Sequence, residues 1–132
     1  MNKLSKLVII VFSIASLISV IYFGEVSTGD IKIGYIGTKT GNEMNYKYRL
    51  FNGIEQQSLY LDENQILEIS YESKTTTGSL DLIIKDPENN IISIHEMAPE
   101  NEISISIPSK GYYRLIIQGS WTSGQYALSW ET

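Results

Sequence analysis

The chain contains no cysteine, and this absence excludes several kinds of structure and site. No disulfide can stabilise the fold, no thiolate can bind a metal or act as a nucleophile, and no lipid-modified cysteine can anchor a bacterial lipoprotein. Proline is scarce, with 3 in 132 residues, and 42% of the residues are hydrophobic, which is typical of a packed protein and not of a disordered one. Stability therefore has to come from an ordinary hydrophobic core.

Basic residues are also few, with 10 Lys and Arg against 15 Asp and Glu and a formal net charge of −5. All the acidic residues lie from Glu25 onward, so without Lys3 and Lys6 the remainder carries a net charge of −7. A nucleic-acid partner is not expected, because its phosphates must be neutralised by Lys and Arg. The length fits one domain and excludes a two-domain enzyme.

One long hydrophobic run stands out, Leu7 to Phe23, which follows Lys3 and Lys6 and carries no charge. The basic flank should stay in the cytoplasm, so we expect the chain after Gly24 to lie outside it. The run is long for a signal-peptide core and short for a spanning helix, and no Ala-x-Ala site follows it. Residues 1–24 are therefore predicted to be an export helix, either a membrane anchor through residues 7–23 or a cleaved signal peptide.

The rest of the chain divides into a linker and a strand-rich domain. Residues 25–45 are rich in Gly, Thr, Ser and Asn and predict a linker with room for one short strand. Residues 46–132 alternate apolar and polar positions, with polar segments at Asn52-Gly53, 74–78 and 119–124 that we interpret as turns. About eight short strands without a helical period predict an antiparallel β-sandwich or barrel. The predicted inward positions include Tyr46, Tyr48, Leu50, Leu59, Leu61, Leu67, Ile69, Tyr71, Leu80, Leu82, Ile84, Ile103, Ile105, Ile107, Tyr113, Leu115, Ile117, Tyr126, Leu128 and Trp130. The same alternation predicts that Phe51 and Ile83 face outward.

Three segments of this domain resemble the bacterial pre-peptidase C-terminal (PPC-like) domain. They are residues 78–90, with Asp81-Leu82 before the turn at Asp86-Pro87, and the closing strands opened by Gly111-Tyr112-Tyr113 and Gly124-Gln125-Tyr126. The resemblance implies a jelly-roll-like β-sandwich, found in secreted or cell-surface proteins beside exported enzymes, without catalysis of its own. The family often has Asp-x-Asp-Leu where this chain has Ser79, so its calcium site is not carried over. No enzyme precedes the domain here, and we expect the sandwich to be the functional part.

Enzymatic chemistry has little support in the sequence. His95 is the single histidine and there is no cysteine, so a His-based triad or a three-ligand zinc site would need carboxylates to complete the set. We expect His95 to be an exposed residue at a strand end. A glycosidase needs only two carboxylates, and Glu68 and Asp81 could be cross-strand neighbours. Acidic residues on a solvated strand face, which discourage aggregation, are the alternative explanation.

The sequence predicts no cofactor, and calcium is the one alternative. Asp86, Glu88 and Asn90 supply oxygen ligands in one turn, and residues 62–64 and 100–102 are similar acidic turns. None of them has EF-hand spacing, and each is also what an ordinary hairpin turn looks like.

The predicted ligand-binding residues are aromatic. Trp121 lies outside the strand alternation between glycines, and Tyr112 occupies an outward position, so the two could bind a sugar or a protein. The alternative is that Trp121 folds back over the open end of the sandwich. We therefore predict a non-catalytic, envelope-exposed or secreted β-sandwich that binds an extracellular protein or a cell-wall polysaccharide. The other hypotheses are a structural or accessory subunit of an exported complex and a small carboxylate-based hydrolase.

Overall fold

The computed structural model describes residues 30–97 and 99–132, and every regular element in this part of the chain is a β-strand. The strands are β1 (Ile31–Ile33), β2 (Ile36–Lys39), β3 (Glu43–Leu61), β4 (Ile66–Lys85), β5 (Ile91–Glu96), β6 (Glu100–Ser106) and β7 (Gly111–Glu131). All of their pairings are antiparallel. The predicted all-β antiparallel class is confirmed, and the predicted export helix lies outside the described residues.

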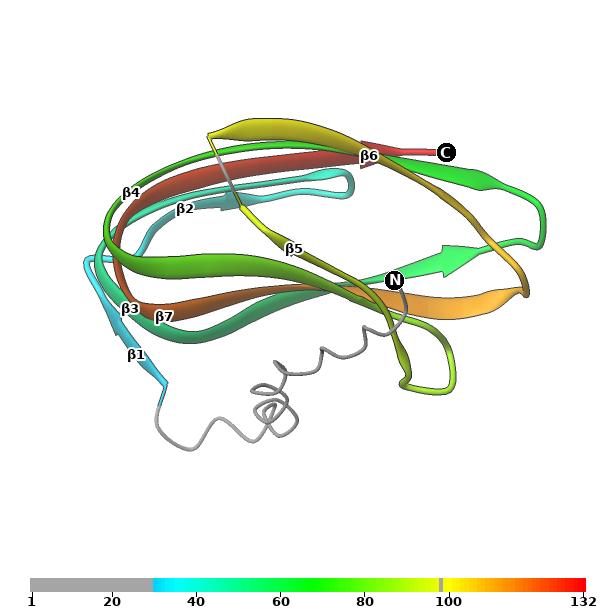
Figure 1. The fold of residues 1–132 in the computed structure, drawn as a ribbon, viewed down its shortest axis with the longest axis horizontal. Coiled ribbons are helices and arrows are strands. Elements are labelled where there is room, and N and C mark those ends of the chain that lie inside the picture. Colours follow the sequence, from blue (N-terminus) through cyan, green and yellow to red (C-terminus); the bar gives the residue numbers. More distant parts are fainter. Residues whose placement is uncertain (1–29, 98) are drawn as a thin grey trace.

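Three long strands of 19, 20 and 21 residues, β3, β4 and β7, form the centre of a single sheet. In Figure 1 these strands curve together, so the sheet folds over on itself and its two halves face each other. We call the first half layer A, with residues 43–51, 66–75 and 124–131 and with β2 and β6 at its edges. The second half is layer B, with residues 53–61, 79–85 and 111–119 and with β5 at one edge.

The prediction of about eight separate strands was wrong, because three pairs of predicted strands are continuous. The segments interpreted as turns at Asn52-Gly53, 74–78 and 119–124 lie within β3, β4 and β7. The ladder changes register at these places, as it does at β-bulges, which bend a strand and increase its twist. The glycines and polar residues therefore bend three neighbouring strands together instead of reversing the chain.

Two of these glycines are required by the bend. Gly78 has φ +70°, and a Cβ added there would lie 2.3 Å from the backbone oxygens of Ser120 and Trp121. Gly124 has φ +148°, and a Cβ there would lie 1.8 Å from the backbone oxygen of Lys74. Any side chain at these positions would push β4 and β7 apart, so only glycine allows the strands to stay paired through the bend.

The core lies between the two layers and consists of the residues that point inward from both. The predicted inward positions on β4 and β7 are buried, as are Tyr48, Leu59 and Leu61 of β3. The remaining predicted inward positions on β3 and β6 are partly exposed, namely Tyr46, Leu50, Ile103 and Ile105. Phe51, predicted to face out, is fully buried because the register shift between Tyr48 and Phe51 turns it inward. Ile83, also predicted to face out, is not part of the core cluster but is only 8% exposed.

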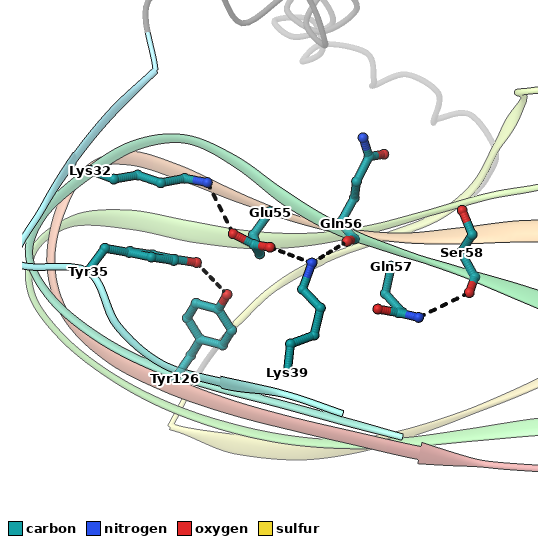
Figure 2. Close-up of polar contacts among 8 residues, drawn as sticks. All are labelled: Lys32, Tyr35, Lys39, Glu55, Gln56, Gln57, Ser58 and Tyr126. Atoms are coloured by element: carbon teal, nitrogen blue, oxygen red, sulfur yellow. Dashed lines mark hydrogen bonds and ion pairs between the residues drawn. The ribbon is translucent and has the colours of Figure 1, made fainter. Parts of the chain in front are cut away.

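The segment predicted to be a linker contains β1 and β2, and β3 begins at Glu43. Figure 2 shows why this segment is fixed in place: Glu55 of β3 lies between Lys32 of β1 and Lys39 of β2, with N–O distances of 3.1 and 2.6 Å. Lys39 Nζ also donates to the backbone oxygen of Gln56 at 3.0 Å. Burial raises the pKa of Glu55, but the hydrogen bonds from the two lysines outweigh it and leave that pKa below its usual range.

Tyrosines fill the space beside this ionic cluster. Tyr35 stacks on Tyr46 with ring centroids 4.4 Å apart. The Tyr35 hydroxyl lies 2.7 Å from the Tyr126 hydroxyl, and Figure 2 shows the two side chains pointing toward each other. Burial raises the pKa of both Tyr35 and Tyr126 well above the usual range, so neither ionises at physiological pH. The tyrosines and the cluster at Glu55 therefore hold the two layers together, which is a structural role.

Candidate functional site

The two aromatic residues predicted as a ligand platform do not lie together. Both belong to β7, but Tyr112 is in layer B and Trp121 is at the bend, nine residues or roughly 30 Å further along the strand. Tyr112 is 65% exposed, and its ring contacts that of Tyr60 on β3, 53% exposed, edge-on at 5.1 Å. Sequence reasoning missed Tyr60 because only the register of β3 and β7 places it opposite Tyr112.

Trp121 does not fold back over the core. Its side chain is 57% exposed and its backbone has φ +48°, a conformation in which non-glycine residues are uncommon. The Trp121 N–H donates to Asn52 Oδ1 at 3.0 Å, which ties the bend of β7 to the bend of β3. The capping alternative is therefore wrong, and Trp121 remains available as a binding residue.

The predicted calcium ligands close their own turn between β4 and β5. Asp86 Oδ1 accepts hydrogen bonds from the backbone N–H groups of Glu88 and Asn90, at 3.0 and 2.8 Å. In residues 30–97 and 99–132 no group of three acidic or histidine side chains is arranged to hold a metal. Calcium binding at this turn stays a prediction, and the ion would have to compete with these hydrogen bonds.

The proposed carboxylate pair is not formed. Glu68 lies in layer A, opposite Glu131 and Ser104, whereas Asp81 lies in layer B, opposite Glu96 and Gln118. The two residues face different partners because the bend in β4 separates them. Burial, followed by the neighbouring charge of Glu96, raises the pKa of Asp81 to about 6.

His95 is half-buried at the inner side of edge strand β5, where the sequence predicts an exposed side chain. Its Nε2 lies 2.5 Å from Ser93 Oγ, and burial lowers its pKa. Within residues 30–97 and 99–132 no carboxylate is hydrogen-bonded to the imidazole to orient it as a base, so the Ser93–His95 pair lacks the third member of a triad.

The outer face of layer A is hollowed. Three adjoining hollows of about 440, 460 and 310 Å³ share lining residues and form one groove along the strands. The first two share Asn45, Glu72 and Ala127, and the last two share Ser70 and Ser129 among others. The floor of the groove is formed by small side chains of β4 and β7, namely Ser70, Ala127 and Ser129. From Gln125 to Glu131 it extends over seven residues of β7, a rise of about 20 Å.

The groove is strongly acidic. Its lining contains six carboxylates and two lysines, namely Glu43, Glu68, Glu72, Glu100, Glu102, Glu131, Lys47 and Lys74. Two pairs of carboxylates lie directly opposite each other across the strands, Glu68 with Glu131 and Glu72 with Glu100. Like charges in such positions destabilise a sheet, so this arrangement is not explained by stability.

The lining also shows which ligands the groove can accommodate. The tyrosines that reach it, Tyr46, Tyr71 and Tyr126, are half-buried or buried, so it offers no exposed ring for stacking. It offers instead carboxylate, amide and hydroxyl oxygens, which accept hydrogen bonds from Lys, Arg or backbone N–H groups. The outward acids are visible in the sequence, but only the pairing of four strands, β3, β4, β6 and β7, brings them to one surface.

No helix in the described ranges is long and apolar enough to cross a membrane. No family model matches the chain, and no curated protein matches it.

Solved structures with similar folds are distant. A CBM4 structure has 10% identity and TM-score 0.49, covering 76% of this chain and 73% of the other. PliG from Aeromonas hydrophila, a periplasmic inhibitor of g-type lysozyme, has 9% identity and TM-score 0.43 over 73% and 93%. A carbohydrate-binding module of Cellvibrio mixtus lichenase 5A, in complex with cellotriose, has 16% identity and TM-score 0.42 over 76% and 86%. At these values the similarities assign neither family nor function to the chain.

Proposed function

We propose that the protein is a non-catalytic, extracytoplasmic β-sandwich module that binds an extended, Lys- or Arg-rich segment of a partner protein in the groove of layer A. The observation that carries the proposal is the continuous groove with six carboxylates against two lysines. Its length of about 20 Å matches some six residues of extended chain. Complementary charge provides both selectivity for the partner and a fast association.

The extracytoplasmic location rests on the sequence. The basic flank and apolar run of residues 3–23 support export, and the PPC-like segments support a jelly-roll-like module of secreted or surface proteins. Membrane anchoring through residues 7–23 would hold the groove near the outer face of the membrane. A structural subunit of an exported complex is a variant of this proposal, in which the bound segment belongs to a permanent partner.

A binding experiment with a matched control tests this function. An extended peptide of alternating Lys and Thr is labelled with fluorescein, and its anisotropy is followed as the full chain is added in detergent. The double variant Glu72→Gln, Glu102→Gln should weaken binding about tenfold, because it removes two facing charges. The control Glu63→Gln, Glu88→Gln changes the net charge equally at two exposed turns outside the groove and should leave affinity nearly unchanged.

Salt provides a second readout. Raising the ionic strength from ~0.05 to ~0.3 M should weaken binding, because exposed charges are screened over shorter distances. The proposal fails if the two double variants lose affinity equally, or if a peptide of alternating Glu and Thr binds as tightly as the Lys peptide.

A second candidate function is polysaccharide binding, favoured by the exposed Tyr60–Tyr112 pair of layer B. Two exposed rings on neighbouring strands offer a surface on which sugar rings can stack. If this pair binds cell-wall polysaccharide, Tyr60→Ala with Tyr112→Ala should abolish retention of the protein on it, whereas the Glu72 and Glu102 variants should not. Trp121→Ala, tested beside them, shows whether the ring at the bend contributes.

A further inference from the structure

The edges of the sheet are protected unequally. β6, an edge of layer A, carries Glu100 and Glu102, and charged side chains on an edge discourage pairing with another strand. β5, an edge of layer B, instead exposes Ile91, Ile92 and Ile94, at 42%, 38% and 57%. Within the described residues β5 pairs only with β4, so its other side is an open, apolar edge.

The backbone of β5 offers hydrogen bonds on that open side. The Met97 N–H donates to the Leu80 backbone oxygen at 2.8 Å, which makes these residues a hydrogen-bonded pair. Pairs alternate along an antiparallel ladder, so Leu82 and His95 are also hydrogen-bonded, whereas Ile83 and Ile94 are not. The N–H and C=O of Ile94 therefore point away from β4, toward the open edge.

The side chains of layer B continue to the same edge. Ile116, Ile83 and Ile94 lie opposite one another on β7, β4 and β5 and form an apolar row across the outer face. Ile116 is 3% exposed and Ile83 is 8% exposed, but Ile94 at the end of the row is 57% exposed. One further strand with an apolar residue opposite Ile94 would extend this row and cover its end.

We propose that this strand is β5 of a second copy of the chain, paired antiparallel about a two-fold axis at Ile94. In this register Ile94 exchanges both backbone hydrogen bonds with Ile94 of the partner copy. The isoleucine row then runs unbroken through both copies, from Ile116 of one to Ile116 of the other. The contact is isologous, which is the usual arrangement of homodimers, and it closes an edge that would otherwise promote aggregation.

The charges near the two ends of β5 favour one direction of pairing. The acidic residues Glu96 and Asp81 lie opposite each other at one end of the strand. At the other end, beside Ile91, the bases Lys85 and Arg114 are offset by Asp86 and Glu88 of the preceding turn, so this end has no net charge. Antiparallel pairing places the acidic end of each copy beside the neutral end of its partner. A parallel arrangement would place like charges together, so the charges select the antiparallel one.

The absence of cysteine makes a direct test possible. Ile94→Cys introduces the single thiol of the full chain, and the pairing puts the two Cα atoms of the symmetric contact about 5.5 Å apart. A short bis-maleimide should therefore link two chains of this variant into a homodimer, seen on a denaturing gel and confirmed by mass. Ser104→Cys is the matched control, because Ser104 is also exposed on an edge strand, the charged β6. It should give several-fold less dimer.

A second variant tests the same contact without a cross-linking reagent. Ile94→Lys places two positive charges opposite each other on the axis, at a residue exposed enough to accept the change. In sedimentation velocity the full chain in detergent should have the mass of a dimer, and this variant should have that of a monomer. Equal cross-linking at residues 94 and 104, a cross-linked product with a different protein, or a monomeric unmodified chain would each refute the dimer. None of these outcomes depends on whether the groove binds a peptide.

Discussion

The outer faces of layer A and layer B are built by the same three strands, yet they differ in chemistry. Layer A presents small and acidic residues over a groove, with Ala127, Ser129 and Ser70 on its floor. Layer B presents the row of Ile116, Ile83 and Ile94. Because β3, β4 and β7 pass through the bend into both layers, each strand changes its outward residues from one half to the other. One bent sheet therefore carries two outer faces of different chemistry, an acidic groove on layer A and an isoleucine row on layer B.

The largest expected difference between the two faces is the loss in free energy of unfolding when one of their residues is replaced. Leu115 is fully buried in the core, and Leu115→Ala should lower the free energy of unfolding by about 2–5 kcal/mol, from lost burial and the cavity left behind. Ile116→Ser on the outer face of layer B should still cost about 1–3 kcal/mol, because Ile116 is only 3% exposed. Ser70→Ala in layer A should change little. Urea denaturation measures all three, and an Ile116→Ser variant as stable as Ser70→Ala would remove the distinction.

The faces should also differ in their response to pH. Asp81 in layer B has a folded pKa of about 6, raised from 3.8 by burial and then by Glu96. Below pH ~4 the Asp81 carboxyl is protonated in both the folded and the unfolded chain, and its contribution to stability is fully present. As the pH rises from ~4 through about 6, the unfolded chain loses this proton before the folded chain does, so the free energy of unfolding falls and the contribution is lost. Asp81→Asn should therefore be more stable than the natural chain at pH 7.5, by roughly 1–2 kcal/mol, and equally stable near pH 4. Parallel stability curves for the two proteins from pH 4 to 7.5 would show that Asp81 is not perturbed.

The smallest expected effect concerns the acidic groove. Glu72 and Glu100 lie opposite each other, so Glu100→Gln should stabilise the fold slightly, by up to ~0.5 kcal/mol, while weakening binding of the Lys peptide. A gain in stability together with a loss of binding is expected where residues are kept for function. Thermal unfolding and anisotropy on the same variant measure both. Loss of stability instead would mean that the carboxylates support the fold.

The sequence predicts the inner side of the strands better than their ends. Alternation identifies Leu82, Leu115 and Leu128 as buried, because one face of each strand must be apolar. It does not reveal that residues 74–78 and 119–124 bend strands, because a Gly-rich polar segment fits a bulged bend as well as a turn. The difference depends on whether neighbouring strands bend at the same level, which is a property of the pairing.

The candidate surfaces were harder to predict for the same reason. Tyr112 and Trp121 are indeed exposed, but the aromatic contact joins Tyr112 to Tyr60, 52 residues earlier in the chain. The groove likewise combines residues of β2, β3, β4, β6 and β7, none of which forms a local motif. Each outward acid taken alone fits an ordinary solvated strand.

The most direct test of the binding groove is a map of the contact itself. Backbone amide signals of the ¹⁵N-labelled protein can be followed by NMR as the unlabelled Lys-Thr peptide is added. Shifts should concentrate on residues 43–47, 68–74, 100–104 and 125–131, which line the groove of layer A, and should be absent around Tyr60, Tyr112 and Ile94 of layer B. Shifts centred on layer B, or spread evenly over both faces, would contradict the assignment of ligand binding to layer A.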